Sequence, residues 1–211
     1  MISYTITACN EDKELAILLD TLSQYITDDD ELIIQLDSER LTEEVREVVY
    51  GYLESIKNFL ILEFPLDNDF SRFKNNIKKH CSKEWIFNID ADEVPSQFLL
   101  SNLKTILESN KDIDMFLVPR WNTVFNITPE HIERWGWKLD EQERVNWPDY
   151  QTRIYKNKEE IVWQNKVHER ITGFETYTNL PEDEAYSLYH MKSIQKQESQ
   201  NMFYANMDKM L

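Results

Sequence analysis

The sequence predicts an α/β fold with a mostly parallel central sheet flanked by helices. Along the first half of the chain, short segments rich in β-branched and aromatic residues alternate with segments whose apolar residues recur every three or four positions. This alternation is typical of a parallel sheet joined by right-handed crossover helices. Polar side chains also follow several predicted strands, at the sheet edge where open α/β folds bind their ligands.

The elements of the first half can be assigned in order. Strands are predicted over residues 2–9, 31–37, 59–65, 85–90 and 115–118. Helices are predicted from apolar stripes containing Leu15, Leu18, Leu19 and Leu22; then Val45, Val48, Val49, Tyr52 and Ile56; then Phe70, Phe73, Ile77 and Cys81; and finally Phe98, Leu99, Leu103 and Leu107, in a helix opened by Pro95. The chain thus begins with repeated strand–helix units.

From about Pro119 the pattern changes. This half reads as irregular loops with short strands at residues 152–155 and 161–163, and residues 193–211 are expected to form a polar closing helix. With 211 residues and 41% hydrophobic residues, the chain can bury one sizeable core. We therefore expect a single domain over residues 1–211.

Composition excludes several function classes. A formal net charge of −16 disfavours nucleic acids and anionic lipid surfaces as partners. With three glycines in the whole chain, neither a dinucleotide-binding glycine motif nor a P-loop can be written. No basic leader or apolar run of membrane-spanning length is present. We expect an intracellular, cytoplasmic protein without a membrane span, whose two cysteines are buried free thiols.

The most informative segment is residues 85–93, an apolar strand that ends in Asp90, Asp92 and Glu93. Carboxylates this close repel one another unless a cation lies among them, so Mn²⁺ or Mg²⁺ is the expected cofactor. The alternative is a solvated acidic turn, which is common in so acidic a chain. The position at the end of a buried strand favours the metal site.

A series of short motifs in a fixed order gives a family resemblance. They are Thr7-Ala8-Cys9-Asn10-Glu11 after the first strand, Asp37 after the second, Lys74-Asn75 in the third helix, Asp90-Ala91-Asp92, the segment Asp149-Tyr150-Gln151-Thr152-Arg153, and Val167-His168-Glu169. In this order they resemble the GT-A-fold (Rossmann-like) glycosyltransferases of the family-2-like branch, over roughly residues 2–190. The chain is also similar to the amino-terminal domain of multidomain glycosyltransferases of large algal viruses, which implies further domains beyond this chain and a host-cytoplasmic location.

The resemblance implies a role for each motif. Residues 1–118 would be the nucleotide-sugar-binding half, with residues 119–192 as the acceptor and catalytic half. The implied donor-binding residues are Thr7, Asn10, Glu11, Asp37, Lys74, Asn75 and Asp90. The implied metal ligands are Asp92, Asp90 and His190, although His190 has an equally good interpretation as a structural histidine. The implied base is Asp149 or Glu169, with Glu93 behind them. His168 would orient Glu169 or contact the diphosphate, and Arg153 would stabilise the leaving group or brace the carboxylates.

The implied activity is metal-dependent transfer of a sugar from a nucleoside diphosphate, with UDP favoured, to a hydroxyl of a glycan or glycoprotein. The tryptophans at positions 121, 135, 137 and 147 are either sugar-stacking platforms or core residues, and Trp135-Gly136-Trp137 is the best candidate platform. Two other functions stay open. One is a nucleotidyltransferase acting on sugar phosphates, although the segment after the first strand is acidic and lacks glycine. The other is a non-catalytic carbohydrate- or nucleotide-binding domain.

Overall fold

The central sheet has seven strands, most of them parallel, as the sequence predicts. In the computed structural model, which describes residues 1–208, the strand order is β11-β6-β8-β4-β1-β2-β3. These strands are β1 (Ile2–Ala8), β2 (Glu31–Asp37), β3 (Phe59–Phe64), β4 (Trp85–Asp90), β6 (Met115–Val118), β8 (Gln151–Lys156) and β11 (Tyr177–Asn179). Strand β8 runs antiparallel to both β4 and β6, whereas the pairs β4–β1, β1–β2, β2–β3 and β11–β6 are parallel.

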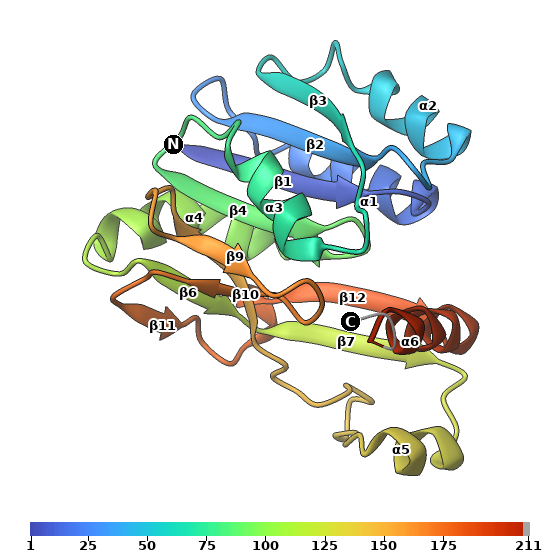
Figure 1. The fold of residues 1–211 in the computed structure, drawn as a ribbon. Helices are drawn as coiled ribbons and strands as arrows, with labels where there is room; N and C mark the ends of the chain where they lie inside the picture. Colours follow the sequence, from blue (N-terminus) through green and yellow to red (C-terminus); the bar gives the residue numbers. More distant parts are fainter. Residues whose placement is uncertain (209–211) are drawn as a thin grey trace.

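Helices cover both faces of this sheet (Figure 1). They are α1 (Asp12–Ser23), α2 (Glu43–Gly51), α3 (Phe70–Lys78) and α4 (Gln97–Ser109). Helix α3 lies on one face, and α1 and α4 lie on the other. Three of these helices begin at a side-chain cap, in which Thr42, Asp69 or Ser96 accepts a hydrogen bond from a backbone N–H of the first turn.

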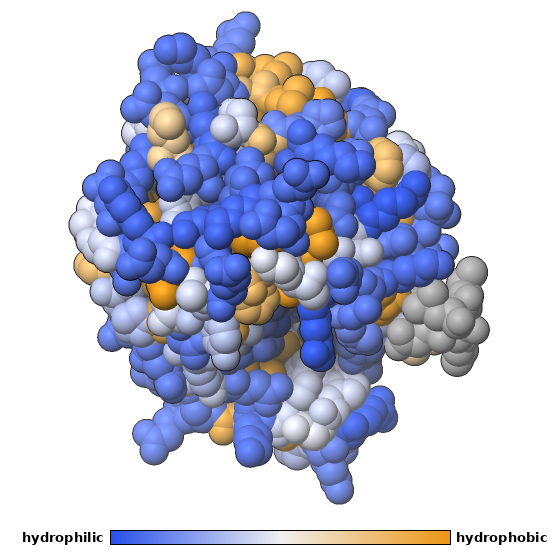
Figure 2. Space-filling view, turned by 60° about the vertical axis from the view of Figure 1, so that its left-hand side comes forward, coloured by the Kyte–Doolittle hydropathy of each residue, from blue (hydrophilic) through white to orange (hydrophobic). Residues whose placement is uncertain are grey.

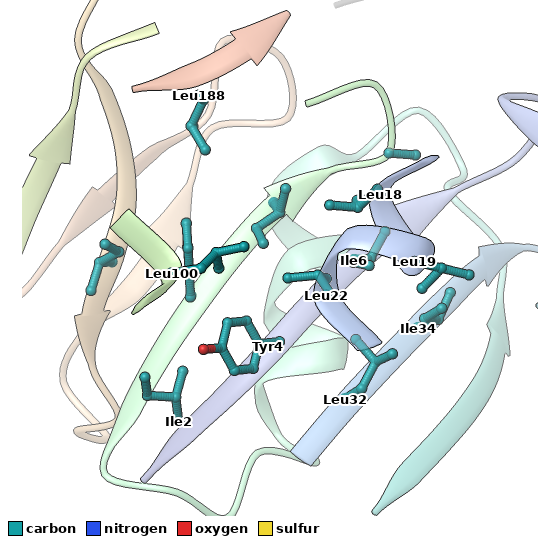
Figure 3. Packing of buried hydrophobic residues seen from close by; sticks show 14 of the residues in the cluster. Ile2, Tyr4, Ile6, Leu18, Leu19, Leu22, Leu32, Ile34, Leu100 and Leu188 are labelled. Carbon is teal, nitrogen blue, oxygen red and sulfur yellow. The ribbon is translucent and has the colours of Figure 1, made fainter. Parts of the chain in front are cut away.

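The main core lies between the sheet and the α1 side. Figure 3 shows Leu18, Leu19 and Leu22 of α1 directed at residues of β1 and β2, where Tyr4 and Leu32 lie. These side chains are at most 2% exposed. Burying them supplies the dominant favourable term for folding, about 1.5–3 kcal/mol per large apolar side chain. The core thereby fixes the edge of the sheet at which β1, β2 and β4 end.

The opposite face of the same strands, beneath α3, is polar although it is buried. Ser3, Thr5, Gln35 and Asn88 are each at most 1% exposed. Gln35 donates to the backbone carbonyl of Phe73 in α3 over 2.7 Å, so this face is bonded to the helix as well as packed against it. Because side chains alternate along a strand, the next residues on this face at the carboxyl edge are Thr7, Asp37 and Asp90.

The second half is more regular than the sequence indicates. Strands β5 (Val94–Pro95), β12 (Leu188–Ser193) and β7 (Arg120–Phe125) form a second sheet, and β9 (Val162–Gln164) pairs with β10 (Arg170–Thr172). The other elements are α5 (Pro129–Trp135), a 3₁₀ turn at Glu184–Tyr186 and α6 (Ile194–Asp208). Strands β7 and β12 were missed because their inward positions carry the polar Asn122, His190 and Lys192, which hide the apolar alternation.

Several predicted boundaries need correction. Pro95 lies in strand β5, and α4 begins at Gln97 after the Ser96 cap, because proline supplies no backbone N–H but fits a short edge strand. Helix α2 ends at Gly51, so Ile56 joins the core from the following turns. Helix α3 ends at Lys78, before Cys81. Both cysteines are half-buried free thiols. Of the predicted closing helix, residues 209–211 lie outside the described residues.

The surface is largely hydrophilic. Figure 2 shows a face on which hydrophilic residues predominate and hydrophobic ones appear in small separate groups. Within residues 1–208, no helix is both long and apolar enough to cross a membrane.

Candidate active site

Two cavities meet at the carboxyl edge of the central sheet. One has a volume of about 360 Å³ and is lined mainly by the ends of β1 and β2 together with α6; we name it the amino-side cavity. The other has a volume of about 400 Å³ and is lined by β7, β8, β12 and the segment around Trp137; we name it the carboxy-side cavity. The residues that line both are Lys74, Asp90, Asp92, Glu169, Gln200 and Tyr204. The predicted Asp-x-Asp segment therefore lies at the junction of the two cavities.

The amino-side cavity contains the predicted residues of the first two strand ends, namely Thr7, Asn10, Glu11 and Asp37. The Glu11 carboxylate accepts hydrogen bonds from the backbone N–H groups of Cys9 and Asn10, over 2.9 and 3.0 Å, and so shapes the loop before α1. The Asp37 carboxylate accepts from Arg40 over 2.6 Å. Arg40 in turn lies 4.7 Å from the ring centroid of Phe203 in α6. This cavity thus has a flat aromatic wall beside fixed polar groups.

Arg153 lines the carboxy-side cavity and is the centre of a charged network at the end of β4. Its guanidinium donates to both oxygens of Glu93, each over 2.7 Å, and to Asp90. Glu93 is fully buried and lines neither cavity, and Arg120 also reaches it at 3.2 Å. The pKa of Arg153 is raised: burial opposes its charge, but Asp90 and Glu93 outweigh that effect. Arg153 therefore braces the carboxylates of the β4 end, one of the two roles predicted for it.

Asp90 stays ionised although it is half-buried. Desolvation alone would raise its pKa, but the attraction of Arg153 and Lys74 is larger and lowers the pKa to about 2. The Lys74 ammonium lies 3.6 Å from Asp90 and 2.6 Å from Glu169. Asp90 is thus held by two cations at the boundary between the cavities.

Asp92 faces a different set of groups. Its Oδ2 lies 3.4 Å from His190 Nε2, 3.6 Å from Lys192 Nζ and 3.6 Å from Lys196 Nζ. Burial would raise the pKa of Asp92, but these neighbours, His190 first among them, hold the pKa well below its usual value. Asp92 is therefore a carboxylate at any pH near neutrality.

The Asp92–His190 pair fits a divalent cation. Burial lowers the pKa of His190, which makes the imidazole neutral near pH 7. Its Nδ1 lies 2.9 Å from Asn122 Oδ1, which can accept the Nδ1 proton and leave Nε2 available to ligate a cation beside Asp92. Ligating histidines usually hold their second nitrogen in this way. Within the described residues, no group of three His, Cys, Asp or Glu side chains is already assembled around one point.

The two leading base candidates have different surroundings. Asp149 lines the carboxy-side cavity, and its carboxylate is held by Arg120 at 2.7 and 2.8 Å and by Gln151 at 3.1 Å. Glu169 lines both cavities and accepts from Lys74 at 2.6 Å. His168 also lines the carboxy-side cavity, with its ring 6.0 Å from that of Tyr204.

Asn75 is the predicted site residue that the structure does not bring to either cavity. Its amide donates to the backbone carbonyl of Trp163 over 2.8 Å and accepts from the Trp163 N–H over 2.9 Å. The Asn75 side chain thus bonds the backbone of β9 as a neighbouring strand would, and it links α3 to β9. This contact is structural. Successive side chains on a helix point about 100° apart, so Asn75 faces away from the cavities that its neighbour Lys74 lines.

The tryptophans divide into two groups. Trp137 lines the carboxy-side cavity and packs against Trp135, with ring centroids 4.7 Å apart. Trp121 and Trp147 instead enclose the guanidinium of Arg144, at 4.7 and 3.9 Å from their ring centroids. Trp137 is therefore the tryptophan of the predicted pair that reaches a cavity.

Several cavity residues were not singled out from the sequence. Among them are Arg120, Lys192, Lys196, Gln200 and Tyr204. A signal was available for Lys192, which lies two residues after His190 and hence on the same face of a strand. The cavity residues of α6 carried no comparable signal. This helix has no apolar stripe in its sequence, so the sequence does not indicate which of its faces packs against the rest of the protein.

Comparisons with known proteins agree with this fold. Residues 3–183 match the sequence family described as glycosyl transferase family 2. Crystal structures of residues 1–349 of TarS from S. aureus match 90% of the chain, at 15% identity. Their TM-scores are 0.63 for TarS alone, 0.64 with UDP-GlcNAc and 0.64 with UDP. The chain spans 58–60% of those solved chains. No curated protein matches it. The fold is thus that of the GT-A glycosyltransferases, and the chain belongs to glycosyl transferase family 2.

Proposed function

We propose that the protein is a metal-dependent glycosyltransferase that moves a hexose from a nucleoside-diphosphate sugar, with UDP favoured, to a hydroxyl of a glycan acceptor. The observation that carries the proposal is the meeting of two cavities at Asp90 and Asp92, at the carboxyl edge of the sheet. Family membership supports glycosyl transfer, and the UDP and UDP-GlcNAc complexes of TarS support a uridine nucleotide.

The amino-side cavity is the proposed donor site, which corresponds to the proposed nucleotide-sugar-binding role of residues 1–118. Its walls offer what a nucleoside needs: a carboxylate and backbone groups for hydrogen bonds, and aromatic faces for the base. Asp37, fixed by Arg40, is placed to accept a hydrogen bond from the base or ribose. Thr7, Asn10 and Glu11 form the adjacent edge of the cavity.

Asp92 and His190 are the proposed ligands of Mn²⁺ or Mg²⁺, and Asp90 is the proposed neighbour that contacts it through water or holds the ribose. When bound, the ion supplies Lewis-acid stabilisation of the diphosphate leaving group. Asn122 orients the imidazole by accepting from Nδ1, and Arg153 with Lys74 keeps Asp90 ionised.

Glu169 is the proposed catalytic base. In an inverting transfer the base must reach the acceptor hydroxyl next to the anomeric carbon, which places it at the boundary of the two sites. Glu169 lines both cavities, whereas Asp149 lines the carboxy-side cavity alone. Each carboxylate is held by neighbours, Glu169 by Lys74 and Asp149 by Arg120 and Gln151, so the position at the boundary decides between them. The acceptor oxygen bonds to the anomeric carbon, its proton passes to Glu169, and the bond to the diphosphate breaks.

The carboxy-side cavity is the proposed acceptor site, formed largely by residues 119–192. Trp137 offers an aromatic face on which the apolar side of a sugar ring can stack. Asp149, held between Arg120 and Gln151, can accept a hydrogen bond from an acceptor hydroxyl.

Calorimetry of UDP binding, with Mn²⁺ and with EDTA, tests the proposal. We expect metal-dependent binding to the wild type, loss of that binding in Asp92→Asn, and unchanged binding in Asp28→Asn, an exposed aspartate paired with Lys57. Turnover of sugar nucleotides then separates a transferase from a non-catalytic binding domain. If UDP, GDP and CDP all fail to bind under both conditions, the glycosyltransferase proposal is wrong.

A further inference from the structure

The environment of Asp92 contains more positive charge than a metal-ligating carboxylate requires. Two ammonium groups, those of Lys192 and Lys196, each lie 3.6 Å from Asp92 Oδ2, the same oxygen that faces His190. A direct charge-assisted hydrogen bond is shorter, about 2.7–2.9 Å. The two ammonium groups therefore lie near the carboxylate without either one bonding it closely.

Both lysines are held in place by second partners. Lys192, whose side chain is 4% exposed, donates to Gln200 of α6 over 2.6 Å. Lys196, one-third exposed, donates to Glu14 of α1 over 2.9 Å. Lys192 lines the carboxy-side cavity and Lys196 the amino-side cavity, so the pair flanks the junction at Asp92. A buried ammonium on a neutral glutamine is costly unless a further anion completes its surroundings.

We propose that Lys192 and Lys196 bind the diphosphate of the donor and, because they share Asp92 with the metal, make metal binding and nucleotide binding mutually dependent. This inference rests on the proposed function and names two residues that complete its donor site.

The coupling follows from the charges at one oxygen. In the free protein, Asp92 is the anion that the two ammonium groups share, at 3.6 Å from each, and Lys196 is also paired with Glu14. A divalent ion on Asp92 takes up that negative charge and adds two positive charges beside two existing ones, which is unfavourable. A diphosphate supplies the missing negative charge to the metal and to both lysines. Metal alone therefore binds poorly, nucleotide alone binds poorly, and each raises the affinity of the other by the same factor.

Two binding measurements on the full chain test this without relying on activity. Electron paramagnetic resonance of free Mn²⁺ gives metal affinity in the absence of nucleotide. Calorimetry of UDP and an NMR titration of uridine give nucleotide affinity with and without the diphosphate. The variants are Lys192→Met and Lys196→Gln. Lys156→Met is the control, because Lys156 is also largely buried and paired with an aspartate, Asp114, but lies at the opposite edge of the sheet.

We expect each site variant to bind Mn²⁺ alone about tenfold more tightly and UDP about tenfold more weakly, with uridine affinity within twofold of the wild type. The control should match the wild type in all three. If Lys192→Met does not fold, as judged by thermal melting, Lys196→Gln carries the test because that side chain is partly exposed.

Two results would overturn the inference. The first is Mn²⁺ affinity that is unchanged or weaker in the site variants. The second is loss of UDP and uridine affinity together, which would mean a structural role for the lysines. If the wild type binds UDP while the variants behave like the control, this inference alone fails. If the wild type binds no nucleotide, the proposed function fails with it.

Discussion

Lys74 Nζ lies 2.6 Å from Glu169 Oε1, which joins helix α3 to the residue just before β10 across 95 positions of sequence. The same ammonium lies 3.6 Å from Asp90 and 4.5 Å from the ring centroid of Trp163. Lys74 is 4% exposed, so its position is fixed by these neighbours. The carboxylate proposed as base is thereby set at a defined place relative to the end of β4.

Glu169→Gln should lower kcat by roughly 10²–10⁴-fold, because the amide keeps the shape of the side chain but cannot accept the acceptor proton. UDP affinity should stay within a few-fold of the wild type, since the diphosphate is held elsewhere. Steady-state kinetics with the sugar nucleotide found in screening, together with UDP calorimetry, measure both. A kcat within threefold of wild type would rule Glu169 out as the base.

Asp149→Asn is the matched comparison, because Asp149 is the other predicted base. Its carboxylate bonds Arg120 and Gln151, so the substitution should mainly weaken that contact. We expect a higher acceptor KM and a lower melting temperature, with a kcat loss well below that of Glu169→Gln. The reverse order of the two kcat losses would transfer the role of base to Asp149.

Asn75→Ala separates the predicted donor role from the structural one. The substitution removes two hydrogen bonds to the backbone of Trp163, each of which contributes about 0.5–1.5 kcal/mol. Urea unfolding should therefore show a loss of roughly 1–3 kcal/mol. UDP affinity at a temperature where the variant is folded should be unchanged. A selective loss of UDP affinity with normal stability would restore the donor role.

The sequence predicted the first half of the fold well because local pattern and tertiary context agree there. Strand β4 was placed correctly over residues 85–90, since an unbroken apolar run suits a strand covered on both faces. The position of Asp90 and Asp92 at its end followed from the general rule for ligand sites in α/β sheets.

The second half was harder because its buried positions are polar. In β12 the inward residues His190 and Lys192 are at most 5% exposed, yet a hydropathy pattern reads them as surface. His190 is buried beside Asp92, which lies about 100 residues upstream. Lys192 is buried beside Gln200, which lies on helix α6. Such complementarity becomes visible only when the chain is folded.

Trp137→Ala should weaken acceptor binding. Loss of an aromatic face removes about 0.5–1.5 kcal/mol of stacking, or roughly a 2- to 13-fold rise in acceptor KM. The donor KM should not change, because Trp137 lines the carboxy-side cavity and not the amino-side one. Trp121→Ala is the control, since Trp121 packs on Arg144 outside the lining of both cavities. Equal effects of the two substitutions on acceptor KM would argue against a stacking role.

Asp114 gives a prediction about pH and stability away from the site. Its carboxylate accepts from the backbone N–H of Glu175 over 3.0 Å and pairs with Lys158 at 2.9 Å and Lys156 at 3.2 Å. The hydrogen bond to Lys158 is the main cause that holds the pKa of Asp114 well below its usual value.

A carboxyl whose pKa is depressed on folding stabilises the native state above its unfolded pKa of about 3.9, and this contribution disappears as the pH falls toward the folded pKa. Asp114→Asn should therefore be less stable than the wild type at pH 7, by roughly 1–3 kcal/mol for the weakened charged hydrogen bonds. The difference should persist down to about pH 4 and shrink below it. Urea unfolding of both proteins between pH 3 and pH 7 measures it, and a difference that does not depend on pH would contradict the ionic origin of the stabilisation.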